Sequence, residues 1–131
     1  MRRTDLHIVI PPAGWVVAML VVSSLPGQSL PDGISLWQWD KLAHIFEYCV
    51  LAVLSGRLLQ WYRIAEPRQS LAILGCGTVF AALDEVHQLF IPNRSCAWQD
   101  LVADIAGIIL GLIIFRIAIR KRMHDQVAHN K

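Results

Sequence analysis

The residues best suited to chemistry gather in the stretch from Ala81 to Asp104, which reads AALDEVHQLFIPNRSCAWQDLVAD. Asp84 and Glu85 directly follow an apolar run, whereas Asp100 and Asp104 open the next one. Carboxylic acids and imidazoles at close range can transfer protons or bind a divalent metal ion. Ionisable residues at membrane depth cost about 2.5–3.5 kcal/mol each on insertion scales and therefore indicate a functional site.

The composition is that of a membrane protein. Of the 131 residues, 55% are hydrophobic and 17% are charged, and the mean hydropathy is +0.46. Four segments approach the roughly 20 residues that cross a bilayer core, and these are Leu6–Leu25, Leu42–Tyr62, Ser70–Ile91 and Leu101–Ile119. The predicted fold class is all-α, an integral membrane bundle of four antiparallel helices in one domain, residues 1–131. A very apolar soluble bundle is disfavoured because the last segment has no polar face after Asp104.

Prolines and glycines mark the expected helix ends. The first helix should tolerate Pro11 and Pro12 in its opening turn and end near Leu25. A secretory signal peptide is the alternative for this segment, but no small-x-small cleavage site ends the run. The expected connections are an irregular interfacial loop, Pro26–Trp39, with Asp40 capping the second helix, then Arg63–Gln69 and Pro92–Gln99. The polar residues after Ile119 are expected to fray.

The charges predict how the chain is oriented. Of the twelve lysines and arginines, all but Lys41 and Arg94 lie in the N-terminus, the second connection with its flanking turns, or the C-terminus. The positive-inside rule then places both termini of this multi-pass membrane protein in the cytoplasm. Seven of the ten acids lie on the opposite half, namely Asp32, Asp40, Glu47, Asp84, Glu85, Asp100 and Asp104. The candidate site is therefore predicted to face the extracytoplasmic side.

Helical spacing indicates which side chains share a face. In the second segment His44 lies one turn from Asp40 and also on a stripe with Lys41 and Tyr48. In the third, Gln88 and His87 both neighbour Asp84. Three antiparallel helices thus bring polar residues to one level, which is how a bundle builds a site.

A face of the fourth segment combines Asp100 and Asp104 with Gly107 and Gly111. The Gly-x-x-x-Gly spacing permits close backbone approach between membrane helices. It is typical of helix packing in general, and a homo-oligomer through Gly107 and Gly111 is one use of it.

Four interpretations of the polar residues remain open. A divalent metal is possible but not favoured, because no tight His-x-x-x-His spacing exists, so the cofactor is unknown. General acid–base catalysis would pair Asp84 or Glu85 with His44 or His87. Arg94 and Lys41 could clamp an anionic headgroup. In the simplest interpretation the same residues form ion pairs that fix helix order, while Arg116–Arg122 is a topology signal and lipid anchor.

Four motifs occur in order between Ser23 and Gly111: SSLPG, DKLAHIFEY from Asp40, ALDEVHQLFIPNRS from Ala82 and DLVADIAGIILG from Asp100. Together they resemble the VanZ-like family of small bacterial membrane proteins, named for a member linked to teicoplanin resistance. The resemblance implies a helical membrane protein whose biochemical activity is unsettled. The family's polar pattern falls here on Asp40, Lys41, His44, Tyr48, Asp84, Glu85, Gln88, Arg94, Asp100 and Asp104. His87 lies within a variant of that pattern, and many relatives have Asn where this chain has Asp104.

The resulting hypothesis is a polar pocket, open to the outer leaflet, that binds or acts on an envelope lipid or a lipid-linked cell-wall intermediate. The candidate catalytic residues are His44, Asp84, Glu85 and His87. The candidate substrate-binding residues are Asp40, Lys41, Tyr48, Gln88, Arg94, Asp100 and Asp104. The alternative is a non-catalytic binding or assembly protein that influences envelope properties or glycopeptide susceptibility. Membrane lipids are the expected partners and nucleic acid is not, because the basic helix end suits lipid headgroups. A transporter is disfavoured because no polar path continues toward the cytoplasmic side.

Overall fold

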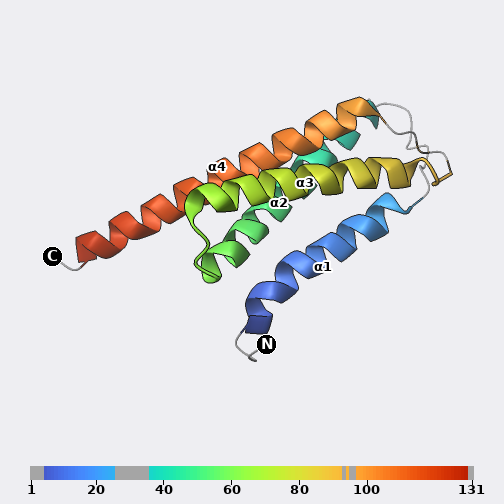
Figure 1. Cartoon of the computed structure of the whole chain (residues 1–131). Helices are drawn as coiled ribbons and strands as arrows, with labels where there is room; N and C mark the ends of the chain where they lie inside the picture. Colours follow the sequence, from blue (N-terminus) through green and yellow to red (C-terminus); the bar gives the residue numbers. More distant parts are fainter. Residues whose placement is uncertain (1–4, 26–35, 93, 95–96, 130–131) are drawn as a thin grey trace.

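A computed structural model of the chain consists of four long helices, with no strand in the part that it describes, residues 5–25, 36–92, 94 and 97–129 (Figure 1). The helices are α1 (Leu6–Ser23), α2 (Leu36–Trp61), α3 (Glu66–Gln88) and α4 (Trp98–His129). Each is long and apolar enough to cross a membrane. The all-α class and the four apolar helices predicted from the sequence are therefore confirmed.

The second helix begins earlier than predicted. It starts at Leu36 rather than Leu42, so Trp37, Trp39 and Asp40 have helical backbone. The predictions that the loop extends to Trp39 and that Asp40 caps the helix are wrong, because the prolines and glycines that suggested a loop all precede Leu36. Residues 26–35 of the predicted loop lie outside the described residues.

The other helix ends differ for similar local reasons. α3 starts at Glu66 because Pro67 occupies the first turn, where its missing N–H is not needed, and it ends at Gln88 rather than Ile91. α4 continues past Ile119 to His129, so the expected fraying of this segment is wrong. Residues 120–128 contain no proline or glycine and several good helix formers, which lets the helix continue.

Glycines bring the backbone of α4 into close contact with that of α2. A Cβ atom on Gly107 would overlap the carbonyl oxygen of Ile45, and one on Gly111 would overlap that of Cys49. Further along, a Cβ on Gly56 would lie 2.7 Å from the ring of Phe115. Residue numbers rise together along this interface, so the two helices run in the same direction. The Gly-x-x-x-Gly face packs against α2 of the same chain, and a homo-oligomer through it stays a prediction.

The first helix is attached to α2 in the opposite direction. The indole Nε1 of Trp15 donates a hydrogen bond to the carbonyl oxygen of Glu47 at 2.9 Å. Toward the other end of the contact, the rings of His7 and Trp61 meet edge to face with centroids 5.3 Å apart. Most of α1 remains exposed and apolar, as expected for a helix with lipid on one side.

Arg116 joins α4 to the start of α3. Its guanidinium donates to Ser70 Oγ at 2.8 Å and to Gln69 Oε1 at 3.2 Å, and it pairs with Glu66 Oε1 at 3.2 Å. Arg116 was predicted to be part of a topology signal and lipid anchor, and it also makes specific contacts within the bundle. The partners Glu66 and Gln69 lie in a segment that is predicted to be a connection, so helical spacing could not assign them to a helix face.

The close approach of α2 and α4 predicts a sharp difference between two glycines. Gly107→Ala should lower the free energy of unfolding by about 1–3 kcal/mol, because the added Cβ meets backbone that cannot rotate away. Gly75→Ala is the matched control, since a Cβ there has nothing within 4 Å, and it should be neutral or slightly stabilising. Unfolding of the purified protein in detergent measures both. Equal effects at the two positions would contradict the packing.

Candidate functional site

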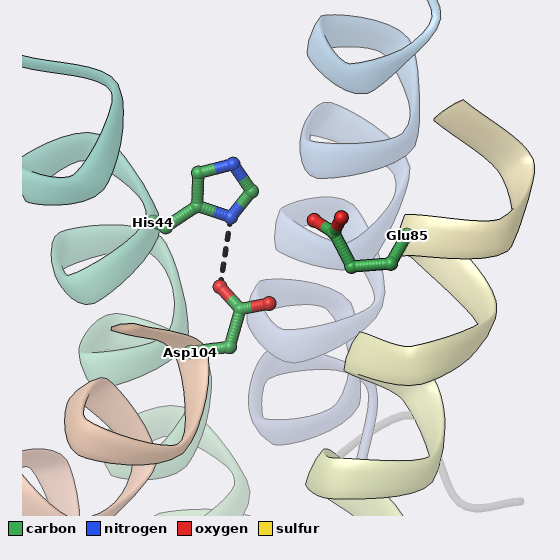
Figure 2. A group of neighbouring side chains, drawn as sticks. All are labelled: His44, Glu85 and Asp104. Atoms are coloured by element: carbon green, nitrogen blue, oxygen red, sulfur yellow. Dashed lines mark hydrogen bonds and ion pairs between the residues drawn. The ribbon is translucent and has the colours of Figure 1, made fainter. Parts of the chain in front are cut away.

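Three helices bring one ionisable side chain each to a common buried point. These are His44 of α2, Glu85 of α3 and Asp104 of α4, which are 5%, 3% and 1% exposed. Each offers a nitrogen or oxygen atom, and these atoms all lie within 4.8 Å of one another. We call these three residues the polar cluster (Figure 2).

Within the polar cluster, His44 and Asp104 form a direct pair. His44 Nδ1 lies 2.8 Å from Asp104 Oδ1. When Asp104 is ionised, its carboxylate only accepts hydrogen bonds, and His44 Nδ1 is then the donor in this contact. Figure 2 shows the carboxylate of Glu85 directed toward the pair from α3.

One turn away on the same two helices, Lys41 and Asp100 form a second ion pair. Their side chains are also largely buried. Two successive charge pairs therefore cross the interface between α2 and α4, at the spacing of one helical turn. These pairs fix the register in which the two helices pack.

The two carboxylate oxygens of Glu85 differ in their contacts. Glu85 Oε2 accepts a hydrogen bond at 3.1 Å from the backbone N–H of Ala97, directly before α4 begins. Glu85 Oε1 is buried and has no hydrogen-bond partner among the described residues. The first contact holds the side chain in place, and the second oxygen is buried without a donor among the described residues.

Three more buried polar atoms lack a partner in the described part of the chain: Tyr48 Oη, Asp84 Oδ1 and His87 Nδ1. The other oxygen of Asp84 accepts from Gln88 Nε2 at 3.3 Å, as the helical spacing predicted. An unpartnered buried polar atom costs about 1–3 kcal/mol. A ligand that supplied hydrogen bonds or charge to these atoms would therefore bind favourably.

The predicted site residues fall into distinct groups. The polar cluster unites two candidate catalytic residues, His44 and Glu85, with Asp104, a candidate substrate-binding residue. Lys41 and Asp100 lie one turn away. Arg94 instead donates hydrogen bonds to the carbonyl oxygens of Leu25 and Val22, at the end of α1. The predicted clamp is thus divided, because Lys41 of α2 is paired with Asp100 of α4, whereas Arg94 binds carbonyl oxygens at the end of α1.

The remaining predicted residues lie on α2 and α3 outside the polar cluster. Tyr48 is fully buried, and its ring centroid lies 6.1 Å from that of Phe80. Asp84 and Gln88 are buried and paired with each other, whereas His87 is half-buried. The side chain of Asp40 lies outside the described residues, although its backbone belongs to α2.

An apolar groove begins about one to two helical turns from the polar cluster. Its volume is about 300 Å³, and residues of all four helices line it, among them Val16, Leu51, Ala72, Ile73, Phe80 and Ile108. Ile108 follows Asp104 by one turn of α4, and Phe80 precedes Glu85 on α3 by little more. Sequence reasoning missed this groove, because its lining residues are ordinary apolar residues of membrane helices.

The helices and the polar cluster define a class, a helical multi-pass membrane protein with ionisable residues buried between its helices. Comparison with protein families identifies the family within that class. The profile of the VanZ/LLP1 family matches residues 7–119, so the chain belongs to that family, as the motifs indicated. No curated protein and no solved structure matches the chain.

The unpartnered hydroxyl of Tyr48 leads to a testable expectation. Tyr48→Phe removes a buried polar atom that has no described partner, so the free energy of unfolding in detergent should stay the same or increase. Trp15→Phe is the comparison, because it removes the hydrogen bond to Glu47 and should cost about 0.5–1.5 kcal/mol. A loss above about 1 kcal/mol for Tyr48→Phe would mean that the hydroxyl has a partner in the folded protein.

Proposed function

We propose that the protein binds an amphiphilic envelope lipid, or a lipid-linked cell-wall intermediate, with the polar end of the lipid at the polar cluster and its tail in the apolar groove. The observation that carries the proposal is the position of the two features. Buried ionisable side chains and an apolar groove of about 300 Å³ lie within two turns of each other on the same helices. That arrangement matches the two chemically different ends of a lipid.

The proposal includes an orientation in the bacterial inner membrane. Antiparallel helices with both termini in the cytoplasm would place the polar cluster in the extracytoplasmic half, open to the outer leaflet. The distribution of lysine and arginine supports this, since the basic C-terminal part of α4 lies at the end away from Lys41 and Asp100.

Reporter fusions test the orientation. Alkaline phosphatase, which is active outside the cytoplasm, should be inactive when fused after Lys131 and active when fused after Arg94, because an odd number of spans precedes the second point. A fluorescent protein that folds only in the cytoplasm should give the opposite pattern. The reverse result for both reporters would place the polar cluster on the cytoplasmic side.

In the enzymatic form of the proposal, Glu85 or Asp84 transfers a proton to or from the lipid headgroup. His44 is the closer partner for this step, because Asp104 holds its ring through Nδ1, as in other oriented imidazoles. His87 is the alternative partner from α3. Lys41, Arg94 and Asp100 would contribute charge at the headgroup, and Tyr48 and Gln88 would contribute hydrogen bonds.

The second candidate is a non-catalytic binding or assembly protein. The observation in its favour is that most of the charged groups already have protein partners, including Lys41 with Asp100, His44 with Asp104, and Arg94 with α1. Such pairs lock helices together and would leave the outer connections to hold a partner. An influence on envelope properties or glycopeptide susceptibility would then be indirect.

Lipid mass spectrometry distinguishes the two candidates. Membranes are compared from cells that produce the wild type, Asp84→Asn or Glu85→Gln at equal abundance. Glu85→Gln keeps an oxygen acceptor for Ala97, so the fold should be preserved. The enzymatic form predicts a lipid that is depleted or formed only with the wild type. Identical profiles would favour the binding protein.

Variants of the apolar groove test whether the protein binds lipid, with or without catalysis. Ala72→Phe fills the groove and should reduce the amount of lipid that copurifies with the protein. Leu71→Phe is the matched control, because Leu71 is 73% exposed and does not line the groove. If both variants retain the same lipid as the wild type, the groove does not hold the tail.

A further inference from the structure

We infer that His44, Glu85 and Asp104 form a binding site for one divalent transition-metal ion, with Zn²⁺ the first candidate. This inference deepens the proposed function, on which it rests for its biological use, because it assigns a ligand to the same polar cluster. Metal content is measurable without any lipid, so the two ideas can fail separately.

The donor atoms are of the right chemical kinds. Imidazole nitrogen suits zinc and its neighbours in the first transition row, and carboxylate oxygen is an accepted third and fourth ligand for them. One imidazole and two carboxylates leave at least one coordination position open, which is the arrangement of catalytic rather than structural zinc sites. A metal is not favoured from the sequence, because no two candidate ligands are close along the chain. In the folded protein, however, three helices bring the candidate ligands together.

The distances between the candidate ligand atoms are close to those of an occupied zinc site. Ligand atoms at about 2.0–2.1 Å from a zinc ion are separated by about 3.4 Å in a tetrahedral arrangement. The nitrogen and oxygen atoms of the polar cluster all lie within 4.8 Å of one another. Zinc would displace the proton from His44 Nδ1, and the 2.8 Å contact of this atom with Asp104 Oδ1 would widen to about 3.4 Å. A small rotation of Glu85, whose carboxylate points toward the pair in Figure 2, would complete the site.

A second observation points to a ligand at this position. Glu85 is 3% exposed, and its Oε1 atom is buried without a partner among the described residues. Its other oxygen is held by Ala97, so the side chain cannot turn away without losing that hydrogen bond. A buried carboxylate oxygen without a donor is stabilised by a cation or by a proton.

The local charge favours a cation with more than one charge. Four buried carboxylates, on Asp84, Glu85, Asp100 and Asp104, lie on facing parts of α3 and α4. The charge of Lys41 balances that of Asp100, and His44 is paired with Asp104. A divalent ion would balance Glu85 and Asp104 together, and it would release His44 from the need to carry a charge. Without a bound cation, these carboxylates would repel an anion at the same position.

The ion would sit where the proposed lipid headgroup meets the protein. The groove begins close by, since Ile108, one turn after Asp104 on α4, and Phe80, five residues before Glu85 on α3, both line it. A bound metal ion can polarise a phosphoryl or carbonyl oxygen, which is the polar group of many envelope lipids. The polar cluster then supplies the ligands, and the groove orients the tail.

Elemental analysis tests the inference. The full-length protein is purified in detergent, stripped with a chelator, loaded with Zn²⁺ and freed of excess metal, and zinc per chain is measured by mass spectrometry. The wild type should hold about one ion per chain. Glu85→Gln and His44→Asn should lower zinc affinity at least about tenfold, as loss of a ligand does. Zinc should also raise the melting temperature of the wild type but not of Glu85→Gln.

Matched controls remove the same residue types elsewhere. His124→Asn and Glu66→Gln change exposed side chains outside the polar cluster and should leave the zinc content unchanged. Should His44→Asn fail to fold, Glu85→Gln decides the matter, because it keeps the acceptor for Ala97. The inference is overturned if the loaded wild type holds no more zinc than Glu85→Gln, or if the controls lose zinc to the same extent. Zinc binding without any lipid effect would overturn the proposed function alone.

Discussion

The structure depends on the close packing of α2 against α4, which buries the pair of His44 and Asp104. In a bilayer the hydrophobic effect does not drive helices together, so van der Waals contact and hydrogen bonds between helices must do so. Gly107 and Gly111 let the two backbones touch, and the charge pairs of Lys41 with Asp100 and His44 with Asp104 select one register. Neither element suffices alone, because unpaired charges at this depth would be costly.

The other helices are placed relative to this pair. α3 packs on α4 where Ile108 fits against Gly77, and Arg116 fastens the far end to Glu66 and its neighbours. This is what brings Glu85 to His44 and Asp104. α1 joins through the Trp15 hydrogen bond to the α2 backbone, and it completes the wall of the groove with Val16. The bundle therefore has a polar contact near each end and an apolar groove between them.

Much of this arrangement could be predicted from the sequence because membrane helices carry a strong signal in their length and hydropathy. Helical spacing and the expected alternation of helix directions predicted that the second, third and fourth helices bring polar residues to one level, where His44 and Asp104 form a pair. The start of α2 at Leu36 and the extension of α4 to His129 were not predicted, because Trp37 and Trp39 suggested an interfacial loop and the polar residues after Ile119 suggested a frayed end. The contact of Arg94 with α1 and that of Arg116 with α3 depend on which faces pack, and one sequence does not specify that. A metal site was not favoured from the sequence, because the candidate ligands His44 and Glu85 lie far apart along the chain.

The measurement that tests the account most directly is a double-mutant cycle on His44 and Asp104. The free energy of unfolding in detergent is compared for the wild type, His44→Ala, Asp104→Ala and the double variant. The account predicts a favourable coupling energy of about 1 kcal/mol or more, because each single variant leaves a buried polar partner without its contact. Additive effects, with a coupling within about 0.5 kcal/mol of zero, would show that the two side chains do not meet and would contradict the register on which the site is built.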